Sequence, residues 1–232
     1  MKRALILILI TLMAGCEKKQ QGPEDPLVSI GKLLGSEEHV LLGKINSAAT
    51  PEEREKLIAE LEATPVKIYH FHSRWSLIHK VDSSGWTESG FDPSLSEAPR
   101  DIAVMEATAY GVSDIENGGL HQFFGNSTGI FAPEMVEWFE RAGMPGPASF
   151  LKQAMAKFGE PYPRSQAARQ RFLEGFKGEK REKWDPFIEL DQPFYDGVNG
   201  SAGGFDAAAD RWLKEVCGIK DLRTPCPKQP AK

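Results

Sequence analysis

Apolar residues recur at helical spacing through the C-terminal half of the chain, in segments bounded by glycine or proline. The stripes are Ile102, Met105, Ala109, Val112 and Ile115, then Met135, Val136, Trp138, Phe139 and Ala142, then Phe150, Leu151, Ala154, Met155 and Phe158, then Phe172, Leu173 and Phe176, and finally Phe205, Ala209, Trp212, Leu213 and Val216. Each stripe lies on one face of a helix, where apolar side chains pack in a core. The sequence therefore predicts a mainly α, compact multihelical bundle over residues 99–217.

Residues 29–98 give a less regular pattern. Thr50 predicts a helix N-cap, because Pro51 follows at the first helical position and Glu52 and Glu53 lie in the first turn. The stretch 65–75 alternates in part, which favours a short strand, with a helix as the alternative. Residues 82–98 are rich in Ser, Gly and Pro, which predicts a loop. We expect a helical or irregular region with a short strand or extra helices.

The first residues have the pattern of a secretion signal. Lys2 and Arg3 precede an apolar run from Ala4 to Met13 that only Thr11 interrupts. A helix of this length spans about 15 Å, because each residue adds about 1.5 Å. Since a bilayer core needs roughly 20 apolar residues, the run predicts a signal peptide and not a transmembrane anchor.

Small residues then precede a cysteine, in the order Met13-Ala14-Gly15-Cys16. This sequence resembles the lipobox of bacterial lipoproteins, with the usual Leu one place early at Leu12. The resemblance implies removal of residues 1–15, lipidation of Cys16 and a membrane anchor made by several acyl chains, palmitate among them. Residues 16–28 are polar and predict a tether, and Glu17 favours the outer membrane, facing the periplasm.

Cysteine usage fits an exported protein. If Cys16 carries lipid, Cys217 and Cys226 remain as an even pair. Such a pair in an oxidising compartment predicts a disulfide, with two free thiols as the alternative. The disulfide would join the end of the last helix to a Pro-rich tail, residues 218–232.

The charge is modest in total but uneven along the chain. The formal charge is −5, which argues against general nucleic-acid affinity, and removal of residues 1–15 leaves 26 basic and 33 acidic residues, a charge of −7. Residues 82–118 hold eight acids and one base, residues 164–183 hold seven bases and three acids, and residues 185–210 hold six acids and no base. Such blocks form solvated faces, complement each other or meet a charged partner.

Residues 116–129 form the most distinctive segment. Asn117, Gly118 and Gly119 adopt positive φ readily and predict a sharp stop in a helix. Residues 120–124 then allow one or two further helical turns, and residues 126–129 predict a turn that caps the next helix.

This segment resembles a bacterial family named after a DNA-mimic protein. In words, the family pattern is an acid, two variable residues, Asn-Gly-Gly-aromatic, one variable residue, Gln-aromatic-Phe, one variable residue, and Asn-Ser-x-Gly. The matching residues are Asn117, Gly118, Gly119, Gln122, Phe123, Phe124, Asn126, Ser127 and Gly129, and Leu120 departs from the usual aromatic. The resemblance extends from Arg100 to Val216, where the Phe-Gly at 158–159, the Arg-rich helix at 164–171 and the Leu190–Tyr195 stretch also fit.

The resemblance implies an all-helical fold and, in the founding member, surface carboxylates that imitate DNA and occupy a DNA-binding regulator. Because the signal and lipobox indicate export, we expect a partner in the cell envelope instead, and no nucleic acid. The sequence thus favours a lipid-anchored, non-catalytic protein-binding module with an acidic helical domain and no cofactor.

Two chemical alternatives use the few histidines. A hydrolase would use His121 with Glu116, Asn117 and Asn126 as an acid–base site. A metal-binding protein would use His70 and His72, which would share one face of a strand.

Overall fold

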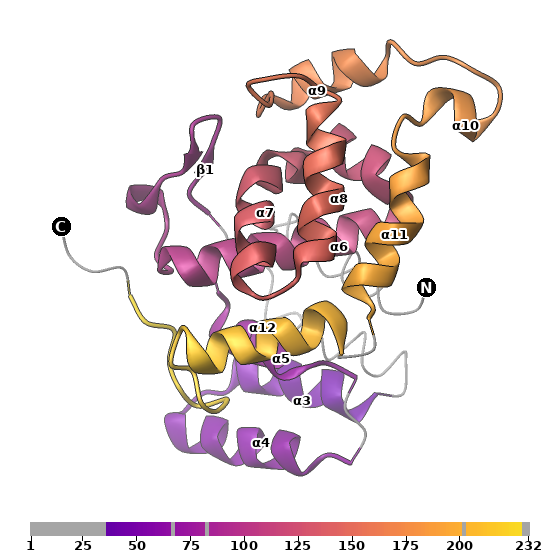
Figure 1. Cartoon of the computed structure of the whole chain (residues 1–232). Coiled ribbons are helices and arrows are strands. Elements are labelled where there is room, and N and C mark those ends of the chain that lie inside the picture. The colour runs from indigo at the N-terminus through magenta and orange to yellow at the C-terminus, as the bar shows by residue number, and fades with distance from the viewer. Residues whose placement is uncertain (1–35, 66–67, 82–83, 201–202, 229–232) are drawn as a thin grey trace, which may run out of the picture. The chain divides into compact units, whose positions relative to one another are not determined.

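The computed structural model describes residues 36–65, 68–81, 84–200 and 203–228 (Figure 1). The predicted signal peptide, Cys16 and tether lie outside these residues. The described chain divides into two compact units. Among the described residues, the first holds those from Ser36 to Lys80 together with Gly218–Cys226, and the second holds those of Val81–Cys217 with Pro227 and Lys228. None of the described helices is long and apolar enough to span a bilayer.

Three helices form the body of the first unit: α3 (Glu37–Ser47), α4 (Pro51–Ala63) and α5 (Phe71–His79). The predicted start of α4 is confirmed, because the Thr50 hydroxyl accepts a hydrogen bond from the Glu53 amide at 3.1 Å and Pro51 is the first helical residue. The Ser36 hydroxyl caps α3 by accepting from the His39 amide.

The strand favoured over residues 65–75 is wrong. The described residues of this stretch contain no strand, and α5 begins at Phe71 with His70 as its N-cap. His72, Trp75 and Ile78 are buried at three-residue spacing, as one face of a helix requires. Burial of these side chains against the rest of the unit thus outweighs the local alternation of the sequence.

The segment 218–226 is a packed part of the first unit, although the sequence indicated only a tail. Its Ile219 and Leu222 side chains are buried. The indole Nε1 of Trp75 donates to the Thr224 carbonyl at 2.7 Å, and the ring Nε2 of His79 donates to the Leu222 carbonyl at 2.9 Å. These bonds fasten the segment 218–226, which we call the strap, to α5, and Arg223 of the strap pairs with Glu55 and Glu62 of α4.

The second unit is mainly helical, as the sequence predicted. Its elements are β1 (Trp86–Thr87), β2 (Gly90–Phe91), a 3-10 turn η1 (Pro93–Leu95), α6 (Arg100–Gly125), a 3-10 turn η2 (Ser127–Phe131), α7 (Ala132–Arg141), α8 (Pro145–Ala156), α9 (Gln166–Leu173), α10 (Arg181–Trp184), α11 (Ile188–Val198) and α12 (Gly204–Glu215). The stretch 82–98, expected as a loop, contains the antiparallel hairpin β1–β2 and η1. Helix α8 packs between α7 and α11 (Figure 1), and α6 contacts both α7 and α11.

Aromatic side chains fill the core of the second unit, in agreement with the stripes. Phe124 is fully buried, and its ring centroid lies about 5 Å from those of Phe123, Phe158 and Phe187. A second group surrounds Trp138, whose ring contacts those of Phe139, Phe205 and Trp212. These stripes therefore pack against one another.

Candidate functional site

The distinctive segment breaks helix α6 at two glycines. Gly118 and Gly119 have non-helical backbone angles, and Gly119 has φ 79° and ψ −179°, a region that is essentially restricted to glycine. A Cβ atom at Gly119 would lie 2.5 Å from the Oδ2 atom of Asp191. The position therefore requires glycine for its backbone conformation and for the space that Asp191 occupies.

Asp191 of α11 caps the helix where it restarts. Its carboxylate accepts from the backbone amide of Leu120 at 2.9 Å and from Arg181 Nη2 at 2.8 Å. Burial raises the pKa of Asp191, and the bond from Leu120 and the charge of Arg181 oppose that rise. Arg181 also donates to Asp185 at 2.9 Å, so one guanidinium joins two buried carboxylates.

Side chains also bind the backbone carbonyls just before the break. The Tyr195 hydroxyl donates to the Ile115 carbonyl at 2.9 Å, and Gln122 Nε2 lies 3.3 Å from the Asp114 carbonyl. A helix end leaves such carbonyls without their usual partners, so these contacts compensate for the interruption. The Leu190–Tyr195 stretch that fits the family pattern thus supplies both a cap and a carbonyl partner.

Asp114 is the centre of a second network. Its carboxylate accepts from Gln122 Nε2 at 2.6 Å, from Asn126 Nδ2 at 3.0 Å and from the Thr128 hydroxyl. These bonds join α6 to η2, because Asp114 precedes the break and Thr128 follows the helix. Asp114 was missing from our predicted site residues, although it is the acid that stands three places before Asn117 in the family pattern.

Arg169 of α9 explains the glycine that ends the motif. Its guanidinium is fully buried and donates to the carbonyls of Phe124 at 2.9 Å and Asn126 at 2.8 Å. A Cβ at Gly129 would lie 2.7 Å from Arg169 Nε, and the Gly129 carbonyl accepts from the Tyr162 hydroxyl at 2.7 Å. Burial lowers the pKa of Arg169, and nothing in the local sequence signals its role.

The remaining motif residues serve the same architecture. Phe123 and Phe124 are fully buried, Leu120 is buried where the family has an aromatic, and Ser127 begins η2 at the surface. The motif therefore builds a broken helix and its exit turn.

The residues of the hydrolase alternative have other partners. His121 packs its ring edge-on against Trp184 of α10, with the centroids 4.9 Å apart. Within the described residues no hydrogen bond joins His121 to Glu116, Asn117 or Asn126. Those three hydrogen-bond instead to Asn199, Ser113 and Asp114, respectively.

The histidines of the metal alternative lie at the start of α5 and not on a strand. The ring centroids of His70 and His72 are 6.4 Å apart, and His72 is buried, with Nε2 at 3.0 Å from the Ser73 hydroxyl. Throughout the part of the chain that the structure describes, no group of three or more His, Cys, Asp or Glu residues could hold a metal ion.

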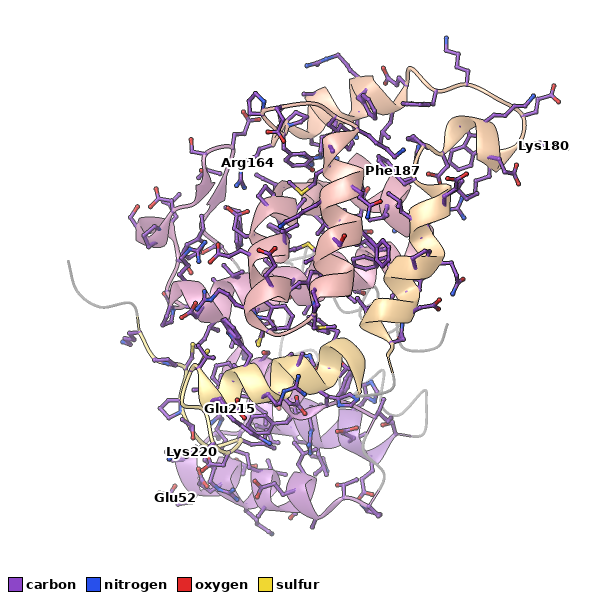
Figure 2. The ribbon with its side chains drawn as sticks, viewed as in Figure 1. Glu52, Arg164, Lys180, Phe187, Glu215 and Lys220 are labelled. Atoms are coloured by element: carbon purple, nitrogen blue, oxygen red, sulfur yellow. The ribbon has the colours of Figure 1, made fainter. Side chains whose placement is uncertain are left out.

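The basic block at 164–183 contributes little positive surface. Arg164 makes two hydrogen bonds of 2.8 Å to Glu134, Arg169 is buried, and Arg181 pairs with Asp185 and Asp191. The other bases alternate with acids at exposed positions: Arg171, Glu174, Lys177, Glu179, Lys180, Glu182 and Lys183. Lys180 stands at the outer edge of the connection into α10 (Figure 2).

Part of the acidic charge is also internal, because Asp185 and Asp191 are buried, and some of the exposed acids lie on one side of α11. Glu189 and Asp196 are exposed on the same side of α11, seven residues apart, and neither makes an ion pair within the described residues. Asn199 follows on that side and donates to Glu116 of α6 at 3.3 Å. We call Glu116, Glu189 and Asp196 the α6–α11 acidic face.

The predicted disulfide stays a prediction. Cys217 follows α12, and Cys226 ends the strap segment, and both side chains are partly buried.

Comparison with known families identifies the family to which the second unit is similar. The sequence model of a family described as DMP19-like protein matches residues 94–216, just over half of the chain. Comparisons with curated proteins and with solved structures give no match. The matched range covers the broken helix, both polar networks and the acidic face, and the chain belongs to the DMP19-like protein family.

Proposed function

We propose that this chain is a lipid-anchored envelope protein whose DMP19-like domain binds a protein partner without catalysis. The observation that carries the proposal is the α6–α11 acidic face, where exposed Glu189 and Asp196 have no cation beside them in the described residues. The motif residues, by contrast, are engaged in holding the fold.

The distribution of charge indicates the chemistry of the partner. Arg169 is buried, and Arg164 and Arg181 are paired with carboxylates. The positive charges of these bases therefore do not neutralise the carboxylates of the α6–α11 acidic face. Uncompensated surface charge of one sign accelerates encounter with a surface of the other sign and selects against like-charged partners. The proposed partner therefore presents a basic surface.

In-cell cross-linking tests the interface. The double variant Glu189→Lys/Asp196→Lys reverses the face, and Glu174→Lys/Glu179→Lys reverses two exposed acids elsewhere in the same unit. We expect the first variant alone to lose the cross-linked partner, with unchanged far-UV circular dichroism for both. Retention of the partner by the first variant would contradict the proposal.

The anchor has its own test. The Met13–Cys16 sequence supports lipidation at Cys16, and the polar residues 16–28 support a tether. Palmitate labelling and outer-membrane fractionation should be lost in Cys16→Ser and retained in Cys217→Ser. Palmitate labelling that persists in Cys16→Ser would contradict lipidation at Cys16.

Family membership favours a second candidate. The family is named after a DNA mimic, so the acidic face would occupy a protein that otherwise binds DNA. The same cross-linking identifies the compartment of the partner. A second measurement, with the purified domain and that partner, asks whether duplex DNA competes with the domain for binding to the partner. Competition by DNA supports mimicry, and an envelope partner that DNA does not displace supports the first candidate.

A further inference from the structure

The chain contains two Asn-Gly pairs, Asn117-Gly118 and Asn199-Gly200, in very different settings. Asn-Gly is the pair most open to attack by a backbone amide on the preceding side chain, because glycine has no Cβ to obstruct the approach. We propose that Asn199 is a site of spontaneous deamidation, which adds a carboxylate beside the α6–α11 acidic face. The chemistry is independent of the proposed partner.

The reaction balances without any enzyme or oxidant. The Gly200 nitrogen loses its proton to solvent and attacks Cγ of Asn199. The Cγ–Nδ2 bond then breaks, and Nδ2 takes a proton from solvent and leaves as ammonia. Water then opens the resulting succinimide to aspartate or isoaspartate.

The backbone at Asn199 leaves this path open. Asn199 is the exposed C-cap of α11, with φ −104° and ψ 15°. Ring closure requires ψ of Asn199 to rotate until the Gly200 nitrogen lies on the same side of the Cα–C bond as Cβ, and the Gly200 amide donates no hydrogen bond within the described residues that would hold it. The rotation therefore disturbs the end of the helix and not its interior.

Asn117 offers an internal comparison, because its setting closes the same path. It lies within α6, and its Nδ2 donates to the Ser113 carbonyl at 2.8 Å. The Gln122 side chain covers Gly118, since a Cβ there would lie 2.2 Å from Gln122 Oε1. Attack at Asn117, directly before the break in α6, thus requires loss of the bond to Ser113 and displacement of the Gln122 side chain, which costs additional free energy.

Deamidation would change the contact between α6 and α11. Asn199 Nδ2 now donates to Glu116 Oε1 at 3.3 Å and to the Tyr195 carbonyl at 3.0 Å. A carboxylate at position 199 loses both donations and places like charge beside Glu116 and Asp196. The product therefore carries a more negative face and a weaker end of α11.

Peptide mapping by mass spectrometry, with isoaspartate detection, tests the proposal on the full chain incubated in mildly alkaline buffer. We expect conversion at Asn199 to exceed that at Asn117 on the order of tenfold or more, as expected for a difference in local opening. Gly200→Ala should slow it strongly while keeping the fold, because the added Cβ lies 3.5 Å from the Asp196 and Gly197 carbonyls, an ordinary contact. Equal rates at the two sites, or no isoaspartate at Asn199, would overturn the proposal.

Discussion

Asp191 accepts a hydrogen bond of 2.9 Å from the backbone amide of Leu120, which lies 71 residues earlier in the chain. A carboxylate from one helix thus caps the last part of another helix, where two glycines interrupt it. The relationship explains why an acid in α11 and the Asn-Gly-Gly sequence in α6 belong to one architecture.

The first prediction concerns this cap. Asp191→Ala leaves the Leu120 amide and the Arg181 guanidinium without their acceptor, so we expect the free energy of unfolding to fall by about 2–4 kcal/mol. Urea denaturation measures the change. Asp196→Ala, on the exposed side of the same helix, is the control and should shift it by less than about 0.5 kcal/mol. Equal effects of the two variants would show that Asp191 does not cap α6.

The second prediction concerns the glycine opposite that carboxylate. Gly119→Ala forces an alanine to φ 79° with its Cβ 2.5 Å from Asp191, so we expect a loss of about 3 kcal/mol or more. Gly146→Ala in α8 meets no atom within 4 Å and should be neutral or stabilising by up to about 1 kcal/mol. Thermal unfolding of both variants measures the two changes in stability. A Gly119→Ala protein as stable as the wild type would contradict the need for glycine at the break.

The sequence predicts those parts of the fold that depend on local pattern. The stripe at 205–216 and the stop at Gly118 are both present in the structure. The apolar stripes do not predict α11, because Pro193 lies inside this helix and proline usually interrupts a helix. The local pattern also gives a strand where burial of Trp75 selects a helix.

The polar networks are harder to predict, since their partners lie far apart in the chain. Arg169 binds the carbonyl of Phe124, 45 residues earlier, and no spacing rule connects them. The site residues that could be found were those within one short segment, and even there the role of Asp114 required the structure. The acidic face likewise emerges only when Arg164 and Arg181 are seen to be paired.

The third prediction concerns the strap of the first unit. Leu222→Ala removes a side chain that is 2% exposed and should lower the stability of the first unit by about 2–4 kcal/mol. Hydrogen exchange should show faster exchange in α4 and α5, with the α7 and α8 amides as reference. Lys220→Ala, at an exposed position of the same strap, is the control, and equal protection in both variants would contradict the strap's role.

The fourth prediction concerns the tail cysteines. If Cys217 and Cys226 form the predicted disulfide, peptide mapping without reductant should recover one linked peptide that reductant separates. In the loop-entropy model, a disulfide that closes such a short loop adds about 2–3 kcal/mol to the free energy of unfolding. Two peptides that both react with a thiol reagent before reduction would show free thiols instead.

The last prediction concerns pH and the first unit. Burial lowers the pKa of His39, and burial together with the charge of Arg54 lowers the pKa of His79 against the opposing effects of Leu222 and Asp221. Both groups have an ordinary pKa of 6.5, so below that pH the unfolded chain binds more protons than the folded chain. The free energy of unfolding is therefore fully maintained above that pH and falls as the pH decreases toward the folded-state pKa values.

Hydrogen exchange between about pH 7.5 and about pH 5.5, corrected for intrinsic rates, should show protection lost in α3 and α5 at the acid end. The His79→Gln variant keeps a donor for the Leu222 carbonyl but cannot take up the proton, so it should retain more of this protection. Because His39 lies in α3 and His79 in α5, the variant should act mainly through the strap and α5. Protection that is independent of pH in the wild-type first unit would show that these buried rings do not control its stability.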